Sequence, residues 1–181
     1  MGWTSSGPTN RALVDNLIRD GIVRDRRVEA ALRAVDRADF CFPYEDHPLP
    51  IGFEQTISAP HMHAHALELL KAQLVDGAQV LDVGCGSGFL TATFAQMLRT
   101  ADGWIGVPGS AFDAIHVGAA AEFVPAALVA QLKPGGRMII PVGRQHLGQV
   151  LMDIDKRADV QLVEHEMMEV RYVPLVKSGY Y

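Results

Sequence analysis

The sequence predicts a single α/β domain built around a parallel sheet, and three observations support this fold class. Strand-like apolar runs alternate with helix-like runs over the second half of the chain, as in sheets whose strands are joined by crossover helices. One apolar run ends in a loop with alternate glycines, Gly84, Gly86 and Gly88. Glycines at this spacing permit positive φ angles and a close approach of the backbone to a ligand. Finally, 181 residues, 49% of them hydrophobic, are enough to bury one core.

Each expected element has a local signal. Apolar residues at helical spacing predict a first helix that follows a cap candidate at Thr9 or Asn10 and ends near Gly21, where a left-handed cap would lie. A second helix should begin at about Asp25, with a buried stripe that includes Val28 and Leu32 and an arginine-rich, solvated outer face. The proline-rich residues 40–52 are expected to be irregular. A third helix should begin near Ala59, with Ser58 as its candidate cap. The alternating part then consists of strand 79–83, helix 89–98, strand 112–117, helix 124–132, a Lys-Pro-Gly-Gly turn and strand 137–142, followed by extended segments at 150–154, 160–163 and 167–174.

Charge, cysteine content and hydropathy argue against several classes of protein. The net charge of −5 provides no broad basic field, so we expect no binding to nucleic acid. Cys41 and Cys85 are far apart in the sequence, which argues against a disulfide framework or a zinc cluster and favours a reducing compartment. The amino terminus lacks an apolar signal-like core, and no run reaches the roughly 18 apolar residues of a membrane span. We therefore expect a cytoplasmic protein that does not bind membranes.

The spacing of the glycine loop indicates its cofactor. A dinucleotide-binding loop needs a glycine at its sixth position, which is Phe89 here, and a phosphate-binding Walker loop needs a Gly-Lys-Ser/Thr end that is absent. The spacing therefore favours S-adenosylmethionine, with a nicotinamide oxidoreductase as a distant alternative. Asp82 ends the preceding strand, where its carboxylate can hold the loop or attract the cofactor's ammonium group. Cys85 is expected to be a small side chain at a tight turn and not a nucleophile, because no base stands beside it.

Three separated stretches carry a family resemblance. They are residues 52–70 (GFEQTISAPHMHAHALELL), 80–88 (VLDVGCGSG) and 112–143 (FDAIHVGAAAEFVPAALVAQLKPGGRMIIPVG). They resemble the protein-L-isoaspartate (D-aspartate) O-methyltransferases, and the TISAPHM run is the most specific part. The resemblance implies the Rossmann-like, three-layer α/β sandwich of class I S-adenosylmethionine-dependent methyltransferases. It also implies one methyltransferase domain over residues 1–181, with a helical extension on the substrate side over about residues 1–55.

The resemblance implies a repair reaction. The family transfers a methyl group from S-adenosylmethionine to the carboxylate of L-isoaspartyl and D-aspartyl residues in damaged proteins. We therefore expect isoaspartyl-containing proteins and peptides as partners, and a monomer. A carboxyl group with a pKa of about 4 is already ionised at pH 7 and needs no general base. Positioning and the replacement of water by fixed dipoles should therefore dominate catalysis.

The resemblance also places site residues. Ser58 matches the active-site serine of the family, where its hydroxyl can orient the substrate carboxylate, although a helix cap is the plain alternative. His116 ends strand 112–117, at the edge where open α/β sheets bind ligands, but a core histidine is equally expected. His61 and His65 share a helix face without an evident third ligand, so we expect no metal. The residues expected to contact the cofactor are Thr56, Ile57, His63, Asp82, Gly84, Cys85, Gly86, Gly88, Asp102 and Gly103.

One part of the family pattern is missing. A class I methyltransferase builds a strand, a helix and a third strand after helix 89–98, and this excursion needs roughly 30 residues. Only the thirteen residues 99–111 stand there. We therefore expect a truncated sheet in which strand 79–83 lies at an edge, and no acidic residue to bind the cofactor's ribose about 20 residues after the glycine loop. The Ala-Asp-Gly triplet at 101–103 resembles the motif after the family's third strand, so the join falls near Thr100.

The missing unit leaves the activity of this short form open. One alternative is a catalytically weakened or inactive remnant that binds peptides or partner proteins, and the lost ribose contact supports it. Another is a class I methyltransferase for a small molecule or RNA, but the Ser58 segment and the absence of basic patches count against it. The chain is short either because its transcript or gene model omits the unit or because the sequence skips an excised region. Its continuous numbering favours the first explanation.

Overall fold

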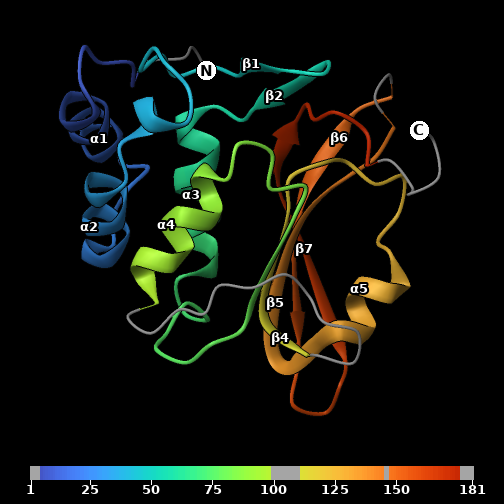
Figure 1. The fold of residues 1–181 in the computed structure, drawn as a ribbon. Helices are drawn as coiled ribbons and strands as arrows, with labels where there is room; N and C mark the ends of the chain where they lie inside the picture. Colours follow the sequence, from blue (N-terminus) through green and yellow to red (C-terminus); the bar gives the residue numbers. More distant parts are fainter. Residues whose placement is uncertain (1–4, 99–110, 145–146, 176–181) are drawn as a thin grey trace. The chain divides into compact units, whose positions relative to one another are not determined.

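The computed structural model describes residues 5–98, 111–144 and 147–175 (Figure 1). The chain divides into two compact units that are interleaved along the sequence. The first unit consists of Met1–Ala78 and Cys85–Gly103, and the second of Gln79–Gly84 and Trp104–Tyr181. Among the described residues, no helix combines the length and the apolar character needed to cross a bilayer.

The first unit contains four α-helices and a two-stranded hairpin among its described residues. These elements are α1 (Asn10–Arg19), α2 (Arg26–Ala34), β1 (Leu49–Gly52), β2 (Gln55–Ile57), α3 (Pro60–Leu70) and α4 (Phe89–Met97). The cap predicted at Thr9 is confirmed, because its side chain accepts a hydrogen bond from the Ala12 amide at 3.1 Å. Asp25, where the second helix was expected to begin, accepts a hydrogen bond from the Arg27 amide at 2.8 Å and caps α2. Just beyond α1, Gly21 adopts the left-handed φ of 71° that commonly ends a helix.

Helix α2 contacts α1, α3 and α4. Its predicted apolar stripe, which includes Val28 and Leu32, is buried. One arginine on the outer face of this helix also contacts another element. The Arg27 guanidinium donates hydrogen bonds to the carbonyls of Lys71 and Leu74, at 2.7 and 2.8 Å, just after α3 ends. Carbonyls at the end of a helix lack partners within it, so Arg27 fastens α2 to the end of α3.

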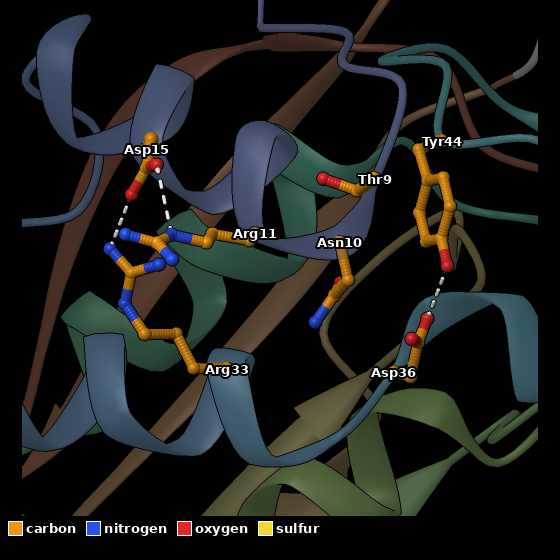
Figure 2. A pocket seen from close by; sticks show the side chains of 7 residues that line it. All are labelled: Thr9, Asn10, Arg11, Asp15, Arg33, Asp36 and Tyr44. Carbon is orange, nitrogen blue, oxygen red and sulfur yellow. Dashed lines mark hydrogen bonds and ion pairs between the residues drawn. The ribbon is translucent and has the colours of Figure 1, made fainter.

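An open pocket of about 720 Å³ lies beside the start of α1 (Figure 2). Its lining side chains are Thr9, Asn10, Arg11, Asp15, Arg33, Asp36 and Tyr44. The charged groups pair within it, because Asp15 lies 2.5 Å from Arg33 and 3.9 Å from Arg11. The Tyr44 hydroxyl donates a hydrogen bond to Asp36 at 2.8 Å. The pocket therefore presents little net charge to an ion, and none of the predicted site residues lines it.

The second unit contains a five-stranded mixed sheet and one α-helix among its described residues. Across the sheet the strands are β3 (Val80–Val83), β4 (Phe112–Val117), β5 (Leu132–Val142), β6 (Gln149–Lys156) and β7 (Leu162–Val170). Strands β3, β4 and β5 run parallel, with α5 (Ala126–Gln131) in the crossover between β4 and β5, and β6 and β7 add antiparallel pairs. Among the described residues, strand β3 pairs with β4 alone, which is the edge position predicted for it.

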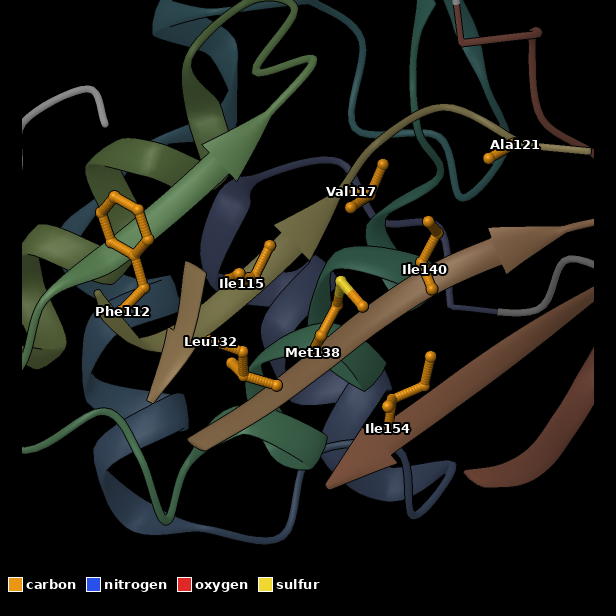
Figure 3. Close-up of a cluster of buried hydrophobic side chains, with 8 residues drawn as sticks. All are labelled: Phe112, Ile115, Val117, Ala121, Leu132, Met138, Ile140 and Ile154. Carbon is orange, nitrogen blue, oxygen red and sulfur yellow. The ribbon is translucent and has the colours of Figure 1, made fainter. Parts of the chain in front are cut away.

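The core of the second unit is a cluster of buried side chains from the strands of its sheet and from the segment after β4 (Figure 3). Its buried side chains are Phe112, Ile115, Val117, Ala121, Leu132, Met138, Ile140 and Ile154. Leu128 and Val129 of α5 pack against this cluster. Alternate residues of a strand point to one face, and this is why Ile115 and Val117 of β4 join the same core while His116 between them does not.

Three segments differ from the sequence-based expectation. The stretch 40–52, expected to be irregular, ends in strand β1. The turn of its hairpin lacks the Asn-Gly or Asp-Gly sequence that usually predicts one. The Lys-Pro-Gly-Gly segment lies within β5, where it forms an irregularity opposite β4 instead of ending the helix before a new strand. Parts of the expected segments 160–163 and 167–174 are joined in one strand, β7, which pairs along β6. In each case strand pairing with a distant segment overrides the local signal.

Candidate active site

The β1–β2 hairpin leads the chain into Ser58. Gly52, Phe53 and Glu54 have φ angles of 90°, 51° and 57°, so both central residues of the two-residue turn are left-handed. Such turns match the twist of paired strands, although they favour asparagine and glycine. The pairing of β2 with β1 leaves Ile57 buried, and Ser58 follows as a half-buried residue between the hairpin and α3.

Ser58 does not cap helix α3. The N-cap is Ala59, which makes no side-chain hydrogen bond. Instead, Oδ1 of the buried Asp46 accepts a hydrogen bond from the His61 amide at 3.0 Å and lies 2.7 Å from His61 Nδ1. The predicted cap is therefore wrong, because a carboxylate from the preceding irregular segment takes this role. Among the described residues, the Ser58 hydroxyl has no hydrogen-bond partner, so it is available to a ligand.

The pKa of Asp46 lies below its usual value. Burial acts to raise this pKa, but hydrogen bonds from the His61 ring and amide outweigh burial and lower it. Asp46 therefore stabilises the fold at pH values above its unfolded pKa of about 3.9. This stabilisation is lost as the pH falls through the lower, folded pKa.

Replacement of Asp46 by asparagine is expected to lower the free energy of unfolding at pH 7 by about 1–3 kcal/mol, because hydrogen bonds to an ionised group are lost. Denaturant unfolding at neutral pH and below pH 4 measures the effect. The difference from the wild type should shrink in acid, where the wild-type carboxylate becomes protonated. The exposed Asp159→Asn is the control, with an expected change below about 0.5 kcal/mol. An equal loss at both pH values would exclude a role for the charge.

Arg37 brings two predicted site residues together. It lies in a 3₁₀ turn (Arg37–Asp39) and is fully buried. Nη2 donates a hydrogen bond to the Ser58 carbonyl at 2.9 Å, and Nη1 lies 3.3 Å from His63 Nδ1. The guanidinium stands over the Phe89 ring at 5.4 Å from its centroid, and burial lowers the pKa of Arg37 to about 10. Sequence reasoning missed this residue because no local signal distinguishes it from the solvated arginines nearby.

The glycine loop fits a ligand held against its backbone. Gly84, Gly86 and Gly88 have φ angles of 74°, 54° and 86°, which only glycine adopts readily. Gly88 is the N-cap of α4 and has no side chain to satisfy the first amides of the helix. Cys85 and its neighbouring glycines on either side are exposed. The predicted cofactor loop therefore presents open main chain at the start of a helix, where polar and anionic groups bind favourably.

Asp82 and His116 form a buried pair at the carboxyl ends of β3 and β4. They are register partners, and Asp82 Oδ1 lies 2.8 Å from His116 Nδ1. An ionised carboxylate only accepts hydrogen bonds, so Nδ1 carries the hydrogen. Beside this pair, the Gly118 amide donates to the Val83 carbonyl at 2.8 Å. A Cβ atom on Gly118 would stand 2.8 Å from the Gly84 carbonyl oxygen, so this approach of two main chains requires glycine.

The remaining residues that the sequence analysis considered lie at three places. Thr56 lies exposed on β2. The rings of His61 and His65 meet edge to face, with centroids 6.4 Å apart. No group of three potential ligands (His, Cys, Asp or Glu) that could hold a metal ion occurs in the part of the chain that the structure describes. Asp102 and Gly103 lie outside the described residues.

Comparison with known proteins identifies the family. The sequence model described as "Protein-L-isoaspartate(D-aspartate) O-methyltransferase (PCMT)" matches residues 8–101 and 97–179. The chain belongs to this family. It is similar to the protein-L-isoaspartate O-methyltransferase of Triticum aestivum, with 43% identity over 94% of this chain and 92% of the wheat protein. The Caenorhabditis elegans protein of the same name is 41% identical over 97% of this chain and 96% of its own.

A solved structure shares the fold of the family. It is a putative protein-L-isoaspartate O-methyltransferase from Plasmodium falciparum in complex with S-adenosyl-L-homocysteine. The TM-score is 0.83 and the identity 31%, over 95% of this chain and 100% of that chain. The chain therefore has the α/β fold of a class I methyltransferase, and the fold class and family predicted from the sequence are confirmed.

The comparisons also bear on the predicted join near Thr100. The two matches to the family meet at residues 97–101, where the sequence predicts the join. The wheat comparison extends over 214 positions, whereas 94% of this 181-residue chain amounts to about 170 residues. About 44 aligned positions therefore have no counterpart here. That length accommodates the roughly 30 residues of a strand–helix–strand unit.

Proposed function

We propose that this chain transfers a methyl group from S-adenosylmethionine to the carboxylate of L-isoaspartyl and D-aspartyl residues in damaged proteins, and so initiates their repair. The observation that carries this proposal is the Ser58 hydroxyl, which has no hydrogen-bond partner among the described residues and stands in a segment held by Arg37. Family membership over nearly the whole chain supports the reaction class. The S-adenosyl-L-homocysteine in the structure of the Plasmodium relative supports the cofactor.

The residues of this chain position the reactants. When bound, S-adenosylmethionine supplies an electrophilic methyl group. The substrate carboxylate is ionised at neutral pH, so no residue has to act as a base. The Ser58 hydroxyl donates a hydrogen bond to one carboxylate oxygen and leaves the other free to react, which provides orientation. The residues that would hold the cofactor are Thr56, Ile57, His63, Asp82, Gly84, Cys85, Gly86 and Gly88, with Asp102 and Gly103 as further candidates.

The proposal extends to the working form of the protein. We infer that residues 1–181 act as one methyltransferase domain, in which about residues 1–55 form a helical extension on the substrate side. The proposed form is a cytoplasmic monomer whose partners are isoaspartyl-containing proteins and peptides. The net charge of −5 supports a protein without a nucleic-acid partner.

A methyl-transfer assay tests the reaction. Labelled S-adenosylmethionine is supplied with an isoaspartyl peptide and with the same peptide containing a normal aspartyl residue. Transfer to the isoaspartyl peptide alone is expected. Transfer to neither peptide, with the isoaspartyl peptide still bound in a direct binding measurement, would overturn the proposed activity and support the second candidate.

The second candidate is a weakened or inactive remnant that binds peptides or partner proteins. The specific observation in its favour is the break in the family match at residues 97–101. The missing unit is the one expected to carry the acidic partner of the cofactor's ribose. A chain without this partner retains the glycine loop and Ser58 but holds the cofactor less firmly.

A further inference from the structure

Arg37 is a buried charge without a direct ion pair among the described residues. Its side chain is fully buried, and Asp46 favours its charged form only at longer range. The neighbouring Asp36 is engaged elsewhere, because its Oδ1 accepts hydrogen bonds from the Ala38 amide at 2.9 Å and the Tyr44 hydroxyl at 2.8 Å. Arg37 Nε has no hydrogen-bond partner in the described part of the chain. Unpaired buried charges are costly, and a neutral side chain of similar size would fold more favourably.

The contacts of Arg37 explain why a guanidinium stands there. Its rigid fork reaches the Ser58 carbonyl with Nη2 and His63 Nδ1 with Nη1. A guanidinium has donors only, so His63 Nδ1 must accept. The hydrogen of the neutral His63 ring therefore lies on Nε2, and a doubly protonated ring would turn a second donor toward the guanidinium.

Phe89 completes this arrangement from α4. Its ring lies 5.4 Å from the guanidinium carbon of Arg37 and 5.1 Å, between centroids, from the His63 ring. An aromatic face attracts a desolvated guanidinium and restricts its orientation. Arg37 is thus held from one side while its fork fixes two residues that the family resemblance assigns to the active site.

We propose that Arg37 is a positioning residue for the methyl transfer, which fixes the main chain of Ser58 and holds His63 in the tautomer that presents Nε2–H to a carboxylate. This inference rests on the proposed function. The carboxylate comes either from the amino-acid end of the cofactor or from the isoaspartyl substrate. Both have the same chemistry, and the two arms of the experiment separate them.

The experiment compares Arg37→Met and Arg37→Lys with the wild type. Methionine removes the charge, whereas lysine keeps the charge without the two-pronged donor geometry. The first readout is the ¹⁵N spectrum of the His63 ring in the ligand-free protein at neutral pH. The wild type should show an unprotonated Nδ1, and both variants should show a mixture of tautomers. This readout does not depend on enzymatic activity, so it still tests the role of Arg37 if the proposed reaction fails.

Measurements of cofactor binding and of turnover show whether His63 meets the carboxylate of the cofactor or that of the substrate. For both variants we expect a 10- to 100-fold loss, either in the affinity for S-adenosylhomocysteine by calorimetry or in kcat/KM with an isoaspartyl peptide at saturating cofactor. The first result assigns the cofactor carboxylate, and the second the substrate carboxylate. The melting temperature of Arg37→Met should be unchanged or higher, because a costly buried charge is removed.

Arg27→Met is the matched control, since Arg27 also donates to two main-chain carbonyls but contacts neither Ser58 nor His63. It should lower the melting temperature and leave the His63 spectrum and cofactor affinity unchanged. An unchanged His63 tautomer in both Arg37 variants, with affinity and kcat/KM within twofold of the wild type, would overturn the proposal.

Discussion

S-adenosylhomocysteine is expected to bind this chain about 10- to 100-fold more weakly than it binds the wheat relative. The acidic residue that holds the ribose hydroxyls in Rossmann-like sites stands about 20 residues after the glycine loop. In this chain only the thirteen residues 99–111 stand where a strand–helix–strand unit is expected, and the two family matches meet at residues 97–101. Hydrogen bonds to a charged group contribute about 1.5–3 kcal/mol, and each 1.4 kcal/mol is about tenfold in affinity.

Isothermal titration of the two proteins under the same conditions measures this difference. As a control, the wheat segment that lacks a counterpart is inserted after Thr100, which should restore most of the affinity. Dissociation constants within threefold of each other for the short chain and the wheat protein would contradict the prediction. They would show that other residues of this chain replace the ribose contact.

Ser58→Ala is expected to lower kcat/KM with an isoaspartyl peptide by about 10- to 100-fold and to leave the melting temperature unchanged. The loss corresponds to one hydrogen bond to a charged carboxylate, about 1.5–3 kcal/mol. Stability should hold because the Ser58 hydroxyl bonds to no other group in the described part of the chain, and Asp46 supplies the cap of α3.

Thr9→Ala is the matched control, because it also removes one hydroxyl from the start of a helix. The Thr9 hydroxyl accepts a hydrogen bond from the Ala12 amide, so its loss should cost about 1 kcal/mol of stability and leave kcat/KM unchanged. The two variants should therefore show opposite patterns in thermal melts and steady-state kinetics. If Ser58→Ala destabilises the protein as Thr9→Ala does and keeps full activity, Ser58 has a structural role alone.

Local signals predicted those parts of the molecule whose interactions are local. The cap at Thr9, the start of α2 near Asp25 and the left-handed Gly21 follow from hydrogen bonds and φ preferences within one turn of chain. Strand 112–117 was predicted with its observed bounds because its apolar run is short and lies between clear breaks. The hairpin of β1 and β2 was missed, since its turn uses Phe53 and Glu54 where glycine or asparagine is usual.

The sequence by itself determined the α/β class, the glycine loop and the family, because each depends on residue order or on spacing within short stretches. Only the tertiary structure decided that Asp46 caps α3, that Asp82 pairs with His116, and that Arg37 links Ser58 to His63. These contacts join residues 15 to 34 positions apart. No propensity or period encodes them, because they exist only once packing has removed water and brought distant polar groups together.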